Sequence, residues 1–572
     1  MKRLLMQRGG ARVAATASSF LRKLENSRDS YGGGSAQRKL ELLRALERRW
    51  LARPRDVLRL HEILCFLRAY PDDPQVLGQV ERMLASFADR GDLRRHRAKL
   101  ADSGIAGTSI NFQFFWPTAR WLAQRWPDRL SLDWQSFDGE ERLHEVLPLL
   151  VPYPETGGFD ELSFSLREWI ERLKGPDETD ALFLVRRIEA LPGDAFTREA
   201  FHDGFDVWFH LEPGPDTPSR THAKYRAAPV VYQARPLQRG RPSLRDEIRR
   251  PPLSVRVVSP REGQKLIDLA CGAMVTRSRD LDVFAYGNKY DVRLVDCGEG
   301  LQFACIGFVP ERRLLLHAVY GFLTLKNGVP MGYVLASVLY RAAGIAYNTF
   351  ETYRGAEAAQ VFGRVLGTVR HLFDTESFSI DPYQLGYGNT EGLKSGAWWF
   401  YYKLGFRPRD AEVRRVLRRE LARMKKNARH RSSVATLEKL AAEHVFLDLD
   451  PAKKEGRLPL WNVSLQISRH LARRFGADRE SAMRTCAREA ARLLGLRSVR
   501  GWSAGERQAW KRWSPLITAL PGVGRWGPAD KRALVEVVRA KGGRHESDFV
   551  GLFDAHRRLR QAVLKLAEAG EV

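Results

Sequence analysis

Cysteine is scarce in this sequence, and long apolar runs are absent. The five cysteines include no CxxC motif and no paired spacing; they are Cys65, Cys271, Cys297, Cys305 and Cys486. This scatter argues against a disulfide framework and a cysteine-ligated zinc site, and it favours a reducing, cytoplasmic location. No run of about eighteen apolar residues occurs, so we expect no membrane-spanning helix. We also expect no bound metal, because no cluster of ligand residues has a metal-binding spacing.

Acidic residues are outnumbered by basic ones. The chain holds 94 Lys and Arg against 68 Asp and Glu, which leaves a formal net charge of +26. That excess suits an acidic partner such as nucleic acid or an anionic surface, although a diffuse, solvated arginine surface explains it equally well. With 572 residues, 44% hydrophobic and 28% charged, the composition is typical of a globular protein with about three domains.

The first third of the chain is dominated by leucines at helical spacing. Residues 1–36 lack this pattern, are basic and end in Gly-Gly-Gly-Ser, which predicts a flexible tail. The absence of acidic residues before Glu25 also resembles an organelle presequence. Residues 37–212 predict a mainly helical domain without a fixed repeat. His61 and Cys65 lie four apart on one helix with no third ligand nearby, which favours a packed pair over a metal site.

An aromatic-rich stretch lies within this region, and a basic stretch follows it. Residues 103–137 carry four tryptophans and three clustered phenylalanines, which form either a base-stacking surface or a hydrophobic core. The core is favoured, because large aromatic side chains dominate protein interiors. Residues 213–254 are rich in Pro and Arg and poor in periodicity, so they predict a linker between domains.

The most informative stretch runs from Val319 to Phe406. Asn327-Gly328 between two apolar runs predicts a β-hairpin. From Ile345 the alternating pattern predicts a further strand, which turns at residues 351–355 into a helix with a buried face from Ala358 to Val369. The helix start would present free backbone N–H groups, which form a ready site for a phosphate.

Two more elements complete this stretch. A strand is expected from Ser377 to about Gln384, followed by a helix that runs through Gly396 to Leu404 and closes at Gly405. The predicted order is therefore strand, Asn-Gly turn, strand, strand, turn and helix, strand, helix.

This span resembles the core of the GNAT-type acyl-CoA N-acyltransferases. The hairpin ending NGVPMGY, the loop FETYRGAEAA and the ending FYYKLGF are similar to motifs of that family. In the last motif, Ala397, Tyr401, Lys403, Gly405 and Phe406 stand in register with the family's pattern. The resemblance implies an α+β fold: a central acyltransferase-like mixed sheet with helices on both faces at residues 255–410, flanked by all-helical N-terminal and C-terminal regions.

The resemblance also implies a cofactor and a set of site residues. Acetyl-CoA or another acyl-CoA would be the acyl donor, and an unidentified amine would be the acceptor. The cofactor-binding positions carried over are Phe350, Arg354, Gly355, Ala356, Ala358, Ala359 and Asn389. Within this set, a strand N–H near Phe350 would bind the thioester oxygen. The general acid would be Tyr401, with Tyr402 as the alternative, and Glu351 and Glu391 are the candidate bases by position.

One residue departs from the family's pattern. Glu357 stands where the family has the second glycine of its Arg-Gly-x-Gly loop, and a carboxylate there would oppose a pyrophosphate. Purely structural roles also suit the predicted residues: Tyr401 beside Trp398 and Trp399 is compatible with core packing, and Arg354 with an ion pair to Glu357.

The region from 411 to 572 predicts a helical, basic domain. Residues 407–431 contain eleven Lys or Arg and three acidic residues, a net charge of +8, on an amphipathic helix. We name as candidate nucleic-acid contacts Arg414, Arg415, Arg418, Arg419, Lys425 and Lys426. Residues 520–524, LPGVG, resemble the loop of helix-hairpin-helix DNA-binding modules. The alternative to an acyltransferase is thus a non-catalytic nucleic-acid-binding protein with a degenerate acyltransferase fold, and a third reading is a helical scaffold.

Overall fold

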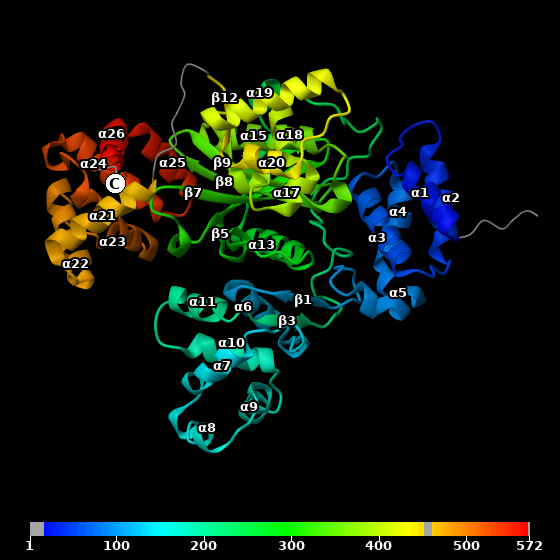
Figure 1. The fold of residues 1–572 in the computed structure, drawn as a ribbon, viewed down its shortest axis with the longest axis horizontal. Coiled ribbons are helices and arrows are strands. Elements are labelled where there is room, and N and C mark those ends of the chain that lie inside the picture. The colour runs from blue at the N-terminus through cyan, green and yellow to red at the C-terminus, as the bar shows by residue number, and fades with distance from the viewer. Residues whose placement is uncertain (1–16, 451–459, 570–572) are drawn as a thin grey trace, which may run out of the picture. The chain divides into compact units, whose positions relative to one another are not determined.

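The structure is a computed structural model, and it describes residues 17–450 and 460–569. The chain forms two compact units that exchange segments of sequence. Unit 1 consists of Met1–Lys224, Val230–Leu237 and Gly272–Asp280, and unit 2 consists of Tyr225–Pro229, Gln238–Cys271 and Leu281–Val572. The fold is mixed α and β, with one large mixed sheet in unit 2 (Figure 1).

Unit 1 is mainly helical, as predicted, but it also contains a small sheet. Its helices are α1 (Ala17–Ser27), α2 (Ser35–Glu47), α3 (Pro54–Ala69), α4 (Pro74–Ala85), α5 (Gly91–His96), α6 (Trp116–Arg125), α7 (Glu140–Val146), α8 (Gly158–Glu161), α9 (Leu166–Leu173), α10 (Asp180–Ala190) and α11 (Ala195–Asp203). Strands β1 (Ile110–Gln113), β2 (Leu130–Leu132) and β3 (Trp208–Leu211) pair antiparallel in the order β1-β3-β2. The prediction of an all-helical N-terminal region is therefore wrong.

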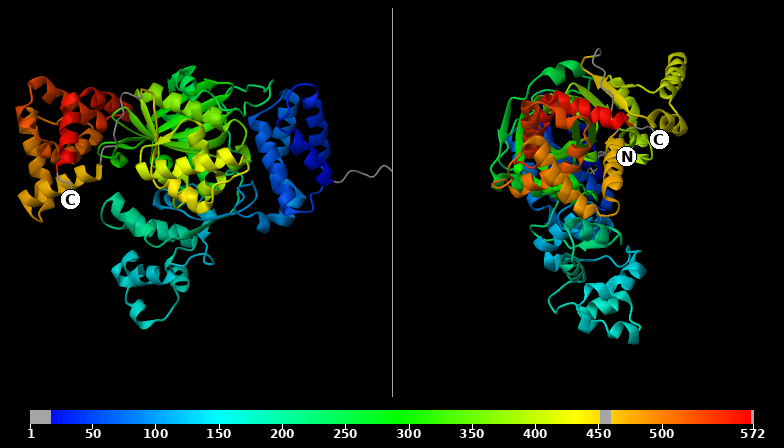
Figure 2. Two further views of the ribbon diagram at one scale, coloured as in Figure 1. Left: turned by 45° about the horizontal axis from the view of Figure 1, so that its top comes forward. Right: turned by 90° about the vertical axis from the view of Figure 1, so that its left-hand side faces the viewer.

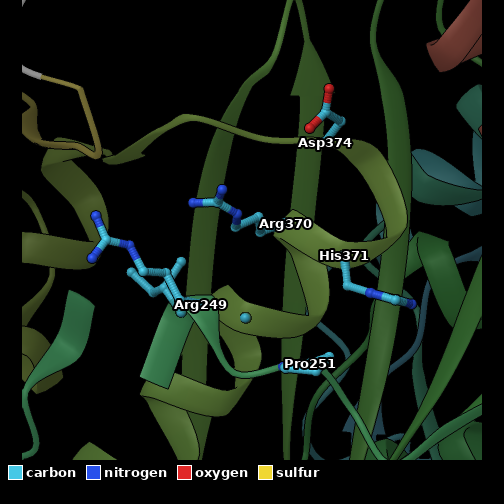
Figure 3. A pocket seen from close by; sticks show the side chains of 7 residues that line it. Arg249, Pro251, Arg370, His371 and Asp374 are labelled. Carbon is cyan, nitrogen blue, oxygen red and sulfur yellow. The ribbon is translucent and has the colours of Figure 1, made fainter. Parts of the chain in front are cut away.

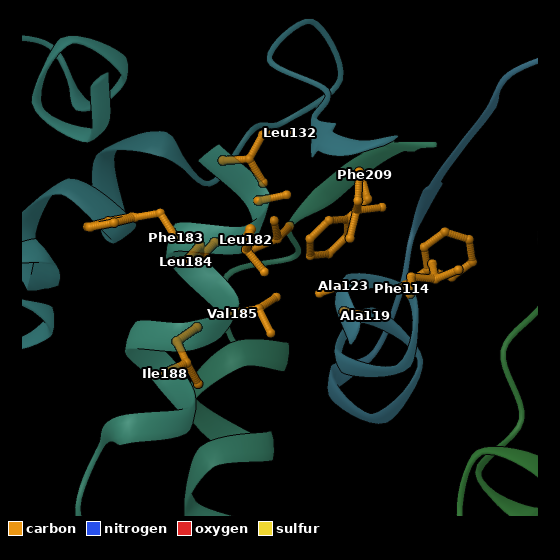
Figure 4. Close-up of a cluster of buried hydrophobic side chains, with 14 of the residues drawn as sticks. Phe114, Ala119, Ala123, Leu132, Leu182, Phe183, Leu184, Val185, Ile188 and Phe209 are labelled. Atoms are coloured by element: carbon orange, nitrogen blue, oxygen red, sulfur yellow. The ribbon is translucent and has the colours of Figure 1, made fainter. Parts of the chain in front are cut away.

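The aromatic-rich stretch forms core, as favoured from the sequence. Phe114, Trp116 and Trp126 are buried in a cluster with Phe183 and Phe209. Figure 4 shows Phe114, Phe183 and Phe209 in this cluster. The cluster fills the space between helices α6 and α10 and the small sheet, so most of these rings are not available to stack on bases.

The buried pair of His61 and Cys65 is structural as well. The Cys65 sulfur lies 3.7 Å from His61 Nε2, which also lies 2.9 Å from the Thr221 hydroxyl. Burial and nearby arginines lower the pKa of His61, so its ring is neutral. Among residues 17–450 and 460–569, no group of three or more His, Cys, Asp or Glu side chains is placed to hold a metal.

Parts of the predicted flexible tail and of the predicted linker have a defined structure. The predicted tail contains α1, whose Leu21 and Leu24 are fully buried, because these residues face the helices that follow. Residues 1–16 of that tail lie outside the described residues. The predicted linker is divided between the two units: Thr221 is buried in unit 1, where Arg68 donates to its carbonyl at 2.6 Å. Buried hydrogen-bonding partners, which composition does not reveal, hold this segment in place.

Unit 2 is built on a nine-stranded sheet of order β11-β12-β10-β9-β8-β7-β6-β5-β4. Its strands are β4 (Ser254–Val257), β5 (Gly287–Gly298), β6 (Leu301–Phe308), β7 (Ala318–Lys326), β8 (Val329–Leu339), β9 (Ala342–Thr349), β10 (Ser377–Ile380), β11 (Arg407–Pro408) and β12 (Val445–Asp448). All neighbours are antiparallel except β9 and β10. The β7–β8 hairpin turns at Asn327 and Gly328 with φ of 50° and 77°, as the Asn-Gly signal predicted.

The helices of unit 2 include α15, which connects the two parallel strands. Its helices are α12 (Leu244–Arg249), α13 (Pro260–Val275), α14 (Asp282–Ala285), α15 (Ala358–Phe373), α16 (Pro382–Leu385), α17 (Thr390–Ser395), α18 (Ala397–Lys403), α19 (Ala411–Lys426), α20 (Val434–Ala441), α21 (Leu460–Phe475), α22 (Arg479–Leu494), α23 (Ala504–Ala519), α24 (Pro528–Lys541), α25 (Glu546–Ala555) and α26 (Arg557–Glu568). The last four residues of α13 belong to unit 1. Helices α21–α26 form a bundle at the end of the chain (Figure 2).

Three details of unit 2 differ from prediction. Strand β10 ends at Ile380, because Asp381 caps the short helix α16 with its side chain. The single helix predicted through Gly396 is two helices, because Gly396 takes a left-handed φ of 70° between α17 and α18. The C-terminal region from 411 is not all-helical, because β12 pairs with β10 and β11 inside the central sheet.

A buried charged network joins the C-terminal bundle to the sheet. Lys541 Nζ lies 2.6 Å from Glu546 Oε1, and both side chains are almost completely buried. Glu546 N–H donates to Asp291 at 2.9 Å, and the Tyr320 hydroxyl donates to the same carboxylate at 2.8 Å. Arg313 donates to the carbonyl of Lys541 at 2.9 Å. These contacts fix the turn between α24 and α25 against β5 and β7.

Candidate functional site at the end of strand β9

The candidate site lies where the only parallel strand pair of the described residues ends. Strands β9 and β10 pair through Ala342–Gly344 and Ser377–Ser379, and β9 then continues without that partner to Thr349. Because β9 and β10 run parallel, the segments that follow them leave toward the same edge of the sheet. Ligands commonly bind at such an edge of a sheet, beyond the carboxyl ends of the strands.

The turn after β9 presents the start of helix α15. A short 3-10 helix, η7 (Glu351–Tyr353), leads to Gly355, whose φ of 78° requires glycine. A side chain at this position would meet no atom within 4 Å, so the space beside Gly355 is open. Helix α15 begins at Ala358 without a side-chain cap, so no side chain satisfies its first-turn N–H groups.

The carboxylate of Glu357 does not lie free at the helix start. Its Oε2 is 3.3 Å from Nζ of Lys326, the last residue of β7, and the two side chains are 10% and 5% exposed. The pair is neutral overall, so it cancels much of the repulsion that Glu357 would exert on a phosphate.

Arg354 forms an ion pair with Glu391. The ion pair between Arg354 and Glu357 that the sequence suggested is therefore not formed. The Arg354 guanidinium contacts Glu391 of α17 directly, and its Nε also donates to the carbonyl of Thr349 at 3.3 Å. Both charged side chains are nearly half exposed. Asn389, the predicted cofactor contact, caps α17 by accepting from Gly392 N–H at 3.1 Å. The ion pair thus ties the turn after β9 to the segment after β10.

Tyr401 of α18 lies in an aromatic cluster beside α15. Its ring is 5.5 Å from that of Phe362 and 5.8 Å from that of Phe406. Burial, with smaller contributions from Tyr347 and Asp381, raises the pKa of Tyr401, so its hydroxyl keeps its proton at neutral pH. The neighbouring candidate, Tyr402, is half-buried.

Tyr347 of β9 links this cluster to the helix start. Its hydroxyl donates to the carbonyl of Ala358 at 3.2 Å and accepts from Thr349 at 2.9 Å. Sequence reasoning missed Tyr347, Thr349 and Lys326. Their strand positions are visible in the sequence, but the partners that give them a place in the site are contributed by other elements.

Two backbone N–H groups at predicted cofactor-binding positions already form hydrogen bonds within the protein. The N–H of Phe350 donates to the carbonyl of Met331 at 2.8 Å, and that of Ala356 donates to Tyr353 at 3.3 Å. The residues placed to present N–H groups to a ligand are therefore Ala358 and Ala359, in the first turn of α15. Glu351 is exposed at the start of η7, on the same turn.

A second feature is the basic helix α19. Its inward acid, Glu420, is 1% exposed and accepts from His430, Ser432 and Arg423 at 2.7 to 2.9 Å. Burial opposes ionisation, but these bonds outweigh it and lower the pKa of Glu420. A groove of about 470 Å³ runs along the helix, lined by Arg407, Pro408, Ala411, Arg414, Leu417, Arg418 and Leu421.

Comparison with known proteins gives no match: no protein family, no curated protein and no solved structure is significantly similar to this chain. Within residues 17–450 and 460–569, none of the helices has the length and apolar character needed to cross a lipid bilayer.

Proposed function

We propose that unit 2 is an acyl-CoA-dependent N-acyltransferase that binds the CoA pyrophosphate at the start of α15. One observation carries this proposal: the open turn at Gly355 leads into an uncapped helix start, while Lys326 neutralises the carboxylate of Glu357 immediately before that helix. Backbone N–H groups and the positive end of the helix dipole favour a phosphate there. Arg354 adds a guanidinium, which exchanges Glu391 for the phosphate when the cofactor binds.

The reaction requires two proton movements. The amine nitrogen attacks the thioester carbon, so that a C–N bond forms and the C–S bond breaks. The leaving thiolate takes a proton, and Tyr401 is the proposed donor, because it stands at the general-acid position of the family pattern and its hydroxyl carries a proton at neutral pH. The amine gives up a proton, and Glu351 is the proposed acceptor, because it is exposed at the start of η7, on the turn that leads to the helix start. The acyl group is proposed to be acetyl, and the acceptor an amine.

Isothermal calorimetry with CoA and acetyl-CoA tests the proposal. The variant Arg354→Glu should lower the affinity at least about tenfold, since it replaces an attraction to phosphate with a repulsion. The matched control is Arg142→Glu in unit 1, which reverses another exposed, ion-paired arginine and should leave binding unchanged. Folded protein that binds neither ligand, or equal binding by Arg354→Glu, would overturn the proposal.

The basic face of α19 supports a second candidate function, binding of nucleic acid. The helix buries its acid Glu420 and leaves the six predicted cations exposed: Arg414, Arg415, Arg418, Arg419, Lys425 and Lys426. Arg414 and Arg418 also line the groove. One of them, Arg415, is paired with Glu412 at 2.6 Å. The LPGVG loop joins helices α23 and α24, with Gly522 at a left-handed φ of 74°.

Fluorescence anisotropy with a labelled oligonucleotide at several salt concentrations tests this second function. Phosphate contacts predict an affinity that falls steeply with salt, and the variant Arg418→Glu/Arg419→Glu should reduce the slope. Arg94→Glu/Arg95→Glu in unit 1 is the matched double reversal and should leave the slope largely unchanged. Salt-independent binding, or none, would rule the function out.

A further inference from the structure

A separate pocket lies at the opposite end of α15 from the proposed cofactor site (Figure 3). Its volume is about 230 Å³, and it opens between helix α12 and the last turns of α15. Its lining consists of Ile248, Arg249, Pro251, Gly367, Arg370, His371 and Asp374. The pocket is smaller than the sites that usually hold a drug-sized ligand, so it suits a small group.

The wall formed by α12 is fixed by one buried arginine. Arg364 is 5% exposed, and its guanidinium donates to the carbonyls of Glu247, Arg250 and Pro251 at 3.2, 2.8 and 3.0 Å. Gly367 permits this close packing, because a side chain there would come within 2.8 Å of the Glu247 carbonyl. The pocket is therefore preformed, and Arg249 extends from a rigid support.

Two guanidinium groups from different elements flank this pocket. Arg249 and Arg370 extend toward the same side of it, whereas the ring of His371 points away (Figure 3). Within residues 17–450 and 460–569, neither arginine has an ion-pair partner. The helix dipole favours a cation in the last turn of α15, which explains the presence of Arg370 there. It does not explain the presence of Arg249.

The one carboxylate at this pocket is already paired. Asp374 lies at the rim, 77% exposed, and Arg341 contacts it at 2.7 Å. Its charge still weakens the attraction of the pocket for an anion. Removing that charge should therefore tighten anion binding, whereas removing the arginines should weaken it.

We propose that this pocket binds a small phosphate dianion, either inorganic phosphate or the phosphate of a small monoester. Two guanidinium groups offer paired N–H donors to phosphate oxygens, and arginine binds phosphate in this way because its donors form a rigid fork. The rigid floor of Gly367 and Pro251 leaves room for a short organic group beside the phosphate. This site does not depend on the acyl-transfer proposal, since it uses none of the same residues.

Calorimetry of the full chain in a low-salt chloride buffer, titrated with inorganic phosphate and with glycerol phosphate, tests this assignment. The variant Arg249→Gln/Arg370→Gln should lose at least about tenfold in affinity. The matched control Arg241→Gln/Arg245→Gln removes two exposed arginines from the same segment outside the pocket, and should bind as the parent does. Asp374→Asn keeps a residue that tolerates the left-handed backbone at this position, and should tighten binding about two- to fivefold.

The outcomes separate the alternatives. Tighter binding of glycerol phosphate than of inorganic phosphate would identify a monoester as the ligand, and the reverse order would identify the free ion. No binding of either, or binding that Arg249→Gln/Arg370→Gln leaves unchanged, would overturn the proposal, since it would show no attraction beyond the diffuse positive charge of the chain.

Discussion

The ammonium group of Lys326 lies 3.3 Å from the carboxylate of Glu357, and both side chains are almost completely buried. Lys326 ends strand β7, and Glu357 immediately precedes helix α15, so the pair connects the β-hairpin to the proposed cofactor site. It also explains how a carboxylate is tolerated at a helix start that we propose binds phosphate.

Removing either partner of this pair should change CoA binding in opposite directions. Lys326→Met leaves Glu357 charged and unpaired beside the phosphates, so we expect weaker CoA binding. It should also destabilise the protein by about 3 kcal/mol, because the carboxylate stays buried. Glu357→Gln leaves Lys326 to attract the phosphates and should tighten binding. Calorimetry with CoA and urea unfolding of both variants measure these effects; a change in the same direction for both would contradict the assignment.

Gly355→Ala should weaken CoA binding by filling the open space and straining the turn. The left-handed φ of 78° costs an alanine about 1 to 2 kcal/mol of stability. Gly495→Ala is the matched control, since Gly495 has a φ of 71° and equally open surroundings at the end of α22. Urea unfolding should show a similar loss for both variants, whereas only Gly355→Ala should change the calorimetric affinity for CoA.

Tyr401→Phe should slow acyl transfer and leave cofactor binding intact. The ring keeps its contacts with Phe362 and Phe406, but the proposed proton donor is gone, and general acids typically contribute about 10²- to 10⁴-fold to the rate. Release of free CoA thiol, followed with a thiol reagent, measures kcat once an amine acceptor is found. Tyr402→Phe serves as the control. An unchanged kcat for Tyr401→Phe would remove Tyr401 from the mechanism.

The buried network around Lys541 should make stability depend on pH. Burial lowers the pKa of Lys541 to about 8, despite the opposing effect of Glu546, whereas the unfolded chain has a lysine pKa of about 10.4. Between these values the unfolded state binds more protons than the native state, so the free energy of unfolding should contain a contribution that rises from about pH 8 to pH 10. Urea unfolding across this range should show that contribution in the parent but not in Lys541→Met.

The same network gives a stability test at neutral pH. Lys541→Met should destabilise the protein by about 3 to 5 kcal/mol, since it leaves the Glu546 carboxylate buried without its closest cation. Burial already raises the pKa of Glu546, so Lys541→Met/Glu546→Gln, which removes the charge, should recover much of the loss. A double variant as unstable as Lys541→Met would show that the charge of Glu546 is not the cause.

The sequence by itself determined the local elements of the central sheet. Asn327-Gly328 identified the β-hairpin, because its left-handed turn matches the twist of paired strands. The periodicity from Ala358 to Val369 identified α15, and the preference of large aromatics for the interior identified the core of unit 1. Each of these signals acts within a few residues or depends only on side-chain chemistry.

Only the tertiary structure decided which distant residues meet. Lys326 and Glu357 are 31 residues apart, Arg354 and Glu391 are 37 apart, and β12 joins a sheet whose other strands end before residue 409. The hydrogen bond from Arg68 to the carbonyl of Thr221, which holds a segment predicted to be a linker, has the same origin. Ion pairs, strand partners and buried hydrogen bonds depend on how the chain folds back on itself, and a single sequence carries no periodic signal for that.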